Sequence, residues 1–241
     1  MYTKETMTTY IRRIMQDIML VRSKYDLWRY LQARMQDRSE EMHLASGFFT
    51  LTNLSLFSDI IVSLFKLYEE KAQDGSLYKF LGIVSDSLSL FDYKESPDDS
   101  PLVSLSTIKK DKEEIRWQYV AIGNLSTWRS KVFAHNDRKY YLDRNRLLQD
   151  ASLTNQDIEV LIDLAWKIVN KYCLALDGSS YYPEVPNAKD VGKVLDILHD
   201  YRQQKMSKAD ALRANILGMG FMITNEQQSA IDLENIMDDE E

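Results

Sequence analysis

Residues 39–71 read SEEMHLASGFFTLTNLSLFSDIIVSLFKLYEEK, a strongly apolar segment near the start of the chain. Ser39 followed by two acids favours a helix start, because a serine side chain can cap the free amide groups of the first turn. Apolar residues then recur at the three- and four-residue spacing of a helix: Leu44, Phe48, Leu51, Leu54, Leu56, Ile60, Ile61, Leu64, Phe65 and Tyr68. The pattern predicts one long central core helix, with Phe48 and Phe49 packed inside.

The segments on either side repeat this period. Long amphipathic helices are predicted over residues 9–36, 113–133 and 154–177, and a shorter one over 77–90. Residues 106–112 either start the helix that follows or remain loop. Thr154 and Asp157 form a capping pattern, and Gly178 suits a left-handed helix end. We therefore expect an all-α fold: an antiparallel bundle of four to five helices over residues 1–178, with a C-terminal helical appendage.

Residues 179–241 form the predicted second part: a linker, a helical appendage and an acidic C-terminal tail. The linker over 179–187 holds two prolines, and helices are predicted over 188–204 and 207–217. The tail over 224–241 has seven acids and no base, and we expect it near the basic residues 129–146. This part could latch onto the bundle, exchange onto a second subunit, or dock a partner.

Composition narrows the function classes. The net charge of −7 argues against coating of nucleic acid by the whole surface, although a local basic site remains compatible with it. The single cysteine excludes an internal disulfide, and no histidine–cysteine cluster has metal-ligand spacing. The sequence has no uninterrupted run of 18 apolar residues, so it predicts no membrane-spanning helix. We expect a cytoplasmic protein with no metal, no cofactor and no membrane contact.

Residues 128–137 read WRSKVFAHND and concentrate chemically able side chains. Arg129 carries a fork of donors that fits a phosphate, and His135 can exchange protons near neutral pH. On a straight helix the two would lie about 120° apart around the axis. Either the helix ends near Ala134, or a second copy completes the site across a two-fold axis. Both residues could also simply satisfy the end of a helix.

A basic segment with two tyrosines follows this motif. Its cations are Arg138, Lys139, Arg144 and Arg146. Aromatic rings beside cations can stack on unpaired nucleotides. Tyr140 and Tyr141 could equally pack the segment against the bundle.

The run from Arg129 to Asp137 resembles the Arg-x(4–6)-His signature of the HEPN superfamily of small all-helical domains. Lys131, the Ala-His pair and the aspartate two places later resemble the AbiU-type abortive-infection branch, and the likeness covers residues 8–177. The resemblance implies a dimer with two Arg-His motifs facing one cleft, and metal-independent ribonuclease activity in many members. Arg129 and His135 match the family residues, whereas Ser130 stands where many members carry Asn, Asp or His.

The first hypothesis is therefore a homodimeric, metal-independent endoribonuclease of the toxin or phage-defence type. His135 would act as general base or acid, and Arg129 would stabilise the phosphorane. Supporting or RNA-binding roles fall to Lys131, Asn136, Asp137, Arg138, Lys139 and Tyr140. Its partners would be RNA, a second copy, and an antitoxin or regulatory protein. The alternative is a non-catalytic HEPN-like module that binds RNA, a nucleotide or a partner protein.

Overall fold

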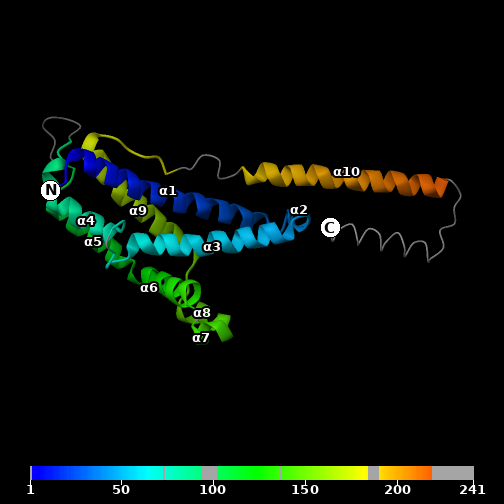
Figure 1. Cartoon of the computed structure of the whole chain (residues 1–241), viewed down its shortest axis with the longest axis horizontal. Coiled ribbons are helices and arrows are strands. Elements are labelled where there is room, and N and C mark those ends of the chain that lie inside the picture. The colour runs from blue at the N-terminus through cyan, green and yellow to red at the C-terminus, as the bar shows by residue number, and fades with distance from the viewer. Residues whose placement is uncertain (1, 73, 94–101, 136, 184–189, 219–241) are drawn as a thin grey trace.

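The computed structural model describes residues 2–72, 74–93, 102–135, 137–183 and 190–218 (Figure 1). These residues form helices and contain no strand, so the predicted all-α class is confirmed. The helices are α1 Lys4–Arg34, α2 Ser39–His43, α3 Ser46–Tyr68, α4 Leu77–Asp86, α5 Leu105–Trp117, α6 Tyr119–Trp128, α7 Arg138–Leu142, α8 Arg144–Asp150, α9 Asn155–Asp177 and α10 Val191–Gly218. A 3₁₀ turn, η1, spans Leu88–Leu90, and a π-helical turn, η2, spans Arg129–Ala134.

The core lies where α1 packs against both α3 and α9. Figure 1 shows α1 and α3 running antiparallel, with α9 beside them. Two tyrosines tie these helices together at their buried hydroxyl ends. Tyr25 of α1 donates to the Asn155 carbonyl at 2.9 Å, and Tyr68 of α3 donates to the Leu161 carbonyl at 2.5 Å. Each bond satisfies a polar group that would otherwise be costly to bury.

The predicted single helix over residues 39–71 is wrong, because the chain breaks between α2 and α3. Ala45 leaves the helical region, with φ −143° and ψ 52°, just before Ser46 and Gly47, both weak helix formers. Phe49 is buried as predicted, but Phe48 is 62% exposed. The other exposed apolar residues of this region are Leu44, Leu51 and Leu54. Only one side of the first half of α3 therefore belongs to the core.

Polar residues on α3 bond across the bundle to α1. The Asn53 side-chain oxygen accepts a hydrogen bond from Gln32 at 2.9 Å. Asp59 forms an ion pair with Lys24. These contacts fix the facing sides of the two helices and offset the cost of placing polar groups inside an apolar run.

By length and composition alone α3 could cross a membrane, since its 23 residues have a mean hydropathy of 1.6 in the most apolar window. This is weak evidence, because the core helix of a soluble protein passes the same test. Only 22% of that window is buried in the structure. Ile60, Ile61 and Leu64 are fully buried against the other helices of the bundle, so this part of α3 belongs to the core.

The predicted helix over residues 113–133 is longer and is interrupted. It begins as α5 at Leu105, where Ser104 and Thr107 form a capping box, so residues 106–112 belong to the helix. It breaks at Gln118, whose amide donates to the Ile115 carbonyl at 3.0 Å in a tighter turn. The aromatic residues beside the break, Trp117 and Tyr119, are both exposed. The chain then continues as α6 and η2.

The start and end of α9 follow the sequence prediction. Thr154 and Asp157 form the expected capping box, and Gly178 adopts the left-handed conformation with φ 78°. By contrast, α4 ends at Asp86 and continues only as the 3₁₀ turn η1, so the helix predicted to residue 90 is shorter. The acidic residues 224–241, and their expected contact with residues 129–146, lie outside the described part of the chain.

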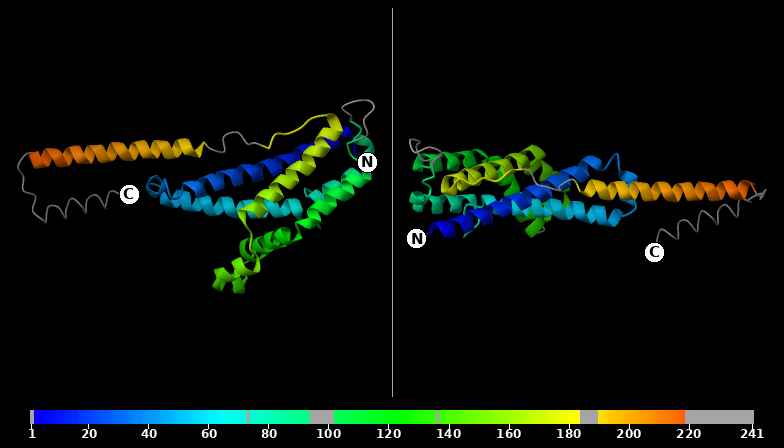
Figure 2. Two further views of the ribbon diagram at one scale, coloured as in Figure 1. Left: turned by 180° about the vertical axis from the view of Figure 1, so that it is seen from behind. Right: turned by 90° about the horizontal axis from the view of Figure 1, so that it is seen from above.

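Helix α10 is one continuous element rather than the two short helices predicted after the linker. Its first three turns pack against α2, and its remaining length continues past the end of the bundle (Figures 1 and 2). Leu195 is buried there against Leu31, Met42 and Phe49. Of the three arrangements considered for this part, α10 latches onto the bundle of its own chain.

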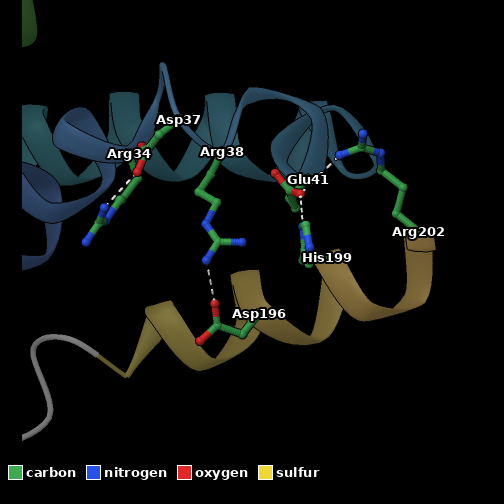
Figure 3. Close-up of polar contacts among 7 residues, drawn as sticks. All are labelled: Arg34, Asp37, Arg38, Glu41, Asp196, His199 and Arg202. Carbon is green, nitrogen blue, oxygen red and sulfur yellow. Dashed lines mark hydrogen bonds and ion pairs between the residues drawn. The ribbon is translucent and has the colours of Figure 1, made fainter. Parts of the chain in front are cut away.

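Charged residues hold α10 on the bundle (Figure 3). Arg38 pairs with Asp196 at 2.8 Å at one end of the contact. Glu41, only 3% exposed, lies 2.7 Å from His199 Nδ1 and 3.1 Å from the Arg202 guanidinium. Because a buried carboxylate needs such partners, Glu41 makes the position of α10 specific.

Replacing Glu41 with glutamine should loosen α10. A hydrogen bond between charged groups is worth about 1.5–3 kcal/mol, so amide exchange in residues 191–202 should quicken about tenfold or more. Hydrogen exchange measured by mass spectrometry checks this. Asp200→Asn is the matched control, because it makes the same charge change on an exposed position of α10. Equal exchange in the two variants would contradict the expectation.

The same contact should depend on pH. The hydrogen bond from His199 lowers the pKa of Glu41, and the charges of His199 and Arg38 add to this effect against the cost of burial. A carboxyl group with a lowered pKa in the folded state stabilises that state above its unfolded pKa, and loses this effect as pH falls through the folded value. The protection of residues 191–202 from exchange should therefore fall on acidification, once the pH drops below the ordinary pKa of a glutamate, about 4.3.

Candidate functional site

The Arg-His motif lies on η2, the π-helical turn that continues α6. Contacts between aromatic rings pack this turn against α3. The ring centroid of Phe57 lies 5.5 Å from that of Trp128 and 6.3 Å from that of Phe133. The α3 helix therefore fixes η2 at both ends, since Trp128 precedes the turn and Phe133 lies near its end. π-Helical turns are rare, and they occur frequently at functional sites.

Hydrogen bonds anchor the approach to the motif. The Trp128 indole donates to the Ala151 carbonyl at 2.8 Å, and the Asn124 amide donates to the Ser152 carbonyl at 2.6 Å. The Ser130 hydroxyl donates to the carbonyl of Ser126, one turn back, at 2.6 Å. The Ser130 hydroxyl therefore contributes to the local helix geometry.

Arg129 lies on the aromatic face of α3. Its guanidinium carbon is 5.4 Å from the centre of the Phe65 ring. No described carboxylate lies within ion-pair distance of it, so its donors remain available for an anion. The sequence did not single out Phe65, because it was one of ten apolar positions in a predicted core helix.

The helix ends immediately before His135. His135 has extended backbone, with φ −138° and ψ 133°, and its side chain is exposed. The Asp137 amide donates to the carbonyls of Lys131 and His135, both at 3.0 Å, and closes the turn. Of the two geometries left open by the spacing, the single chain therefore adopts the one in which the helix ends near Ala134.

Asp137 is engaged by its own segment. Its carboxylate caps α7 by accepting from the Lys139 amide at 3.0 Å, and it pairs with Lys131 at 3.2 Å. The hydrogen bond from the Lys139 amide, followed by that from Lys131, lowers the pKa of Asp137. The ion pair between Lys131 and Asp137 thus stabilises the turn on which His135 lies. Asn136 lies outside the described residues.

The basic segment after the motif is partly neutralised. Lys139 pairs with Asp150, which raises the pKa of the lysine and lowers that of the aspartate. Tyr140 is buried, and its hydroxyl donates to Asp150 at 3.3 Å. Of the two roles considered for Tyr140, the structure shows packing, whereas Tyr141 is 64% exposed. Arg138 is exposed, and no described carboxylate pairs with it.

The protein family of the chain follows from its match to a family model. The family model for the HEPN domain described as AbiU2 matches residues 5–196, which is most of the chain. The chain belongs to the HEPN AbiU2 family. The resemblance drawn from the Arg129–Asp137 run is thereby confirmed. The AbiU2 match begins in the first turn of α1 and ends in α10, at the aspartate that pairs with Arg38.

Other comparisons add no further likeness. No curated protein and no solved structure matches the chain at a significant level. Within the part of the AbiU2-family chain that the structure describes, no group of three His, Cys, Asp or Glu side chains could hold a metal ion.

Proposed function

We propose that this HEPN AbiU2-family chain is a metal-independent endoribonuclease of the defence type, with Arg129 and His135 as its catalytic residues. The observation that carries the proposal is the accessibility of the two motif residues, Arg129 at the start of η2 and His135 directly after its end. Arg129 has no described carboxylate partner, and the exposed His135 follows directly on the helix end. A phosphate could reach the arginine while the imidazole remains free to move a proton.

The reaction uses the nucleophile that RNA itself supplies. His135 removes the proton of a 2′-hydroxyl, and the oxygen attacks the adjacent phosphorus. Arg129 donates to the phosphorane oxygens as negative charge develops on them. The 5′-oxygen then leaves and takes up a proton, supplied by the second histidine of a dimer or by water. The products are a 2′,3′-cyclic phosphate and a 5′-hydroxyl.

A homodimer is part of this proposal. Leu51, Leu54 and Phe65 lie within about 60° of one another around α3, at roughly 100° per residue. The two leucines are 66% and 62% exposed, and the half-buried Phe65 ring contacts the Arg129 guanidinium. Exposed leucines at one end of this apolar stripe are typical of an interaction surface. Pairing two copies along it would bring both motifs to one interface.

Leu51→Asp should convert the protein to a monomer. A charge placed in an apolar two-fold interface appears twice, and burying it unpaired costs several kcal/mol. Light scattering at about 10 µM checks this, with the wild type expected at twice the chain mass of 28.2 kDa. Leu20→Asp is the control, because Leu20 is an exposed leucine on α1 outside the stripe. A monomeric wild type would remove the dimer from the proposal.

The experiment that tests the activity compares RNA with DNA in excess chelator. Purified protein is incubated with a single-stranded RNA and with a DNA of the same sequence. We expect only the RNA to be cut, because DNA lacks the 2′-hydroxyl. The fragments should carry 2′,3′-cyclic phosphate and 5′-hydroxyl ends. Cutting of DNA, or cutting that requires a divalent ion, would contradict the mechanism.

Binding without cleavage would favour the second candidate, a non-catalytic module. The observation behind this candidate is that Lys131, Asp137 and Lys139 are already engaged by their own segment. These ion pairs order the motif, but they also occupy the side chains of Lys131, Asp137 and Lys139, which a catalytic site would need for its substrate. RNA that binds and survives intact would therefore identify a HEPN-like binding domain.

A further inference from the structure

A cleft of about 510 Å³ opens beside the motif, between the end of α3, α4 and the α5–α6 helices. This volume falls within the range of sites that hold small organic ligands. Its lining includes Phe65 of α3, Tyr78 of α4, Arg116 of α5, and Tyr119 and Ser126 of α6.

The cleft begins where the Arg-His motif begins. Phe65 lines it and is also the ring on which the Arg129 guanidinium lies, 5.4 Å from the ring centre. Ser126 lines it too, and its carbonyl accepts the Ser130 hydroxyl at 2.6 Å. A phosphate held by Arg129 would therefore place the neighbouring nucleotide at the mouth of the cleft.

The side chains of the cleft suit an unpaired base. Tyr119 is 74% exposed, so its ring offers an open face for stacking. Arg116 is exposed, and no described carboxylate lies within ion-pair distance of it. Glu69, Glu70 and Lys71 also line the cleft. Carboxylates repel a phosphate but accept hydrogen bonds from the amino groups of bases.

The half-buried Tyr78 is influenced by both acidic and basic side chains of the cleft. Burial raises the pKa of its phenol, Glu70 raises that pKa further, and Arg116 opposes the shift. The hydroxyl therefore lies within the fields of one carboxylate and one guanidinium. Such a group can donate to an acceptor on a base edge or accept from a donor. The cleft thus provides an aromatic ring for stacking, hydrogen-bonding groups, and two cations beside two carboxylates, which together favour a nucleobase over a free phosphate.

We propose that this cleft binds the unpaired base next to the scissile phosphate, with Tyr119 as the stacking platform and Arg116 as a contact to the RNA backbone. The proposal rests on the proposed function, because it places the phosphate at Arg129. It requires single-stranded RNA, since a paired base cannot enter a cleft of this kind.

The test measures affinity separately from cleavage. Fluorescence anisotropy is recorded with a labelled single-stranded 12-mer whose 2′-hydroxyls are methylated, so that it cannot be cut. Tyr119→Ala should weaken binding about tenfold, the range of one base–aromatic stack. Trp117→Ala is the matched control, because Trp117 is an equally exposed aromatic residue two positions away and outside the cleft lining. It should bind like the wild type.

A second variant tests the backbone contact. Arg116→Gln should reduce the slope of log affinity against log salt concentration by about 0.7, the value for one contact to single-stranded nucleic acid. Lys109→Gln, an exposed cation of α5 that does not line the cleft, should leave the slope unchanged.

The outcomes separate the two proposals. Equal affinity of Tyr119→Ala and the wild type, in a protein that cuts RNA, overturns the base-binding cleft and leaves the ribonuclease standing. Weaker binding by Tyr119→Ala, in a protein that binds RNA but never cuts it, supports the cleft and overturns the ribonuclease. A wild-type protein with no affinity for the 12-mer overturns the cleft.

Discussion

His135→Ala should lower the rate of RNA cleavage by about 10²–10⁴ while leaving RNA affinity nearly unchanged. The exposed imidazole follows the end of η2, and no described residue bonds to it, so its removal should disturb no packing. The loss would therefore report proton transfer alone. Single-turnover cleavage of a labelled RNA measures it, with melting temperature as the check on folding.

The arginine of the same motif should behave differently. Arg129→Ala removes a contact to the phosphorane worth about 3 kcal/mol, roughly a hundredfold in rate. Arg129→Lys should restore only part of this, because the planar fork is lost.

The matched control for His135→Ala is His43→Ala, because His43 is an exposed histidine on α2 that lies outside the motif. Full activity in His135→Ala, or an equal loss in His43→Ala, would show that the motif is not the site of chemistry.

Asp111→Ala should destabilise the fold by about 3 kcal/mol. Asp111 on α5 is completely buried and accepts from the Tyr172 hydroxyl at 2.6 Å and the Lys171 ammonium at 2.5 Å, both on α9. Burial, followed by the bond to Asp111, raises the pKa of Tyr172, so the phenol keeps its proton to a higher pH than an exposed tyrosine does. Removing the carboxylate would leave the buried hydroxyl and the lysine without their acceptor.

Urea denaturation measures this change in the free energy of unfolding. Glu114→Gln is the control, because Glu114 pairs with Lys167 at 3.1 Å between the same two helices, but the lysine side chain is 59% exposed. An exposed pair of this kind contributes about 0–1 kcal/mol. Similar losses in the two variants would mean that Asp111 is not a special contact between α5 and α9.

Local signals explain which elements were predictable. The bounds of α9 follow from Thr154, Asp157 and Gly178, because a cap depends on residues within one turn of the helix end. The break before α3 was missed because the weak helix formers Ser46 and Gly47 lie inside a strongly periodic apolar run, and that period predicted a continuous helix. The exposure of Phe48 has the same cause, because periodicity does not say which apolar positions find a partner.

The motif was predictable as a set of residues, but its surroundings were not. Arg129 and His135 were identified by type and spacing, and the end of the helix near Ala134 was one of two geometries considered. The π-helical turn has no sequence signature of its own, because it differs from an α-helix only in hydrogen-bond register. Phe65 and Asp111 were missed because one lies in an apolar run and the other in a charged run, where each looked ordinary.

The π-helical turn has a consequence for sequence variation in this family. Each residue of an α-helix rotates the chain by roughly 100°, so inserting or deleting one residue would swing everything after it to another face. A turn closed by i→i+5 bonds takes up one residue more than an α-turn. The contacts of Phe57 with Trp128 and Phe133, and of Phe65 with Arg129, hold η2 against α3 in this wider register. A deletion of one residue between Arg129 and His135 could therefore be accommodated only by a change from the π-helical to the α-helical register, which would alter the contact between Phe133 and Phe57.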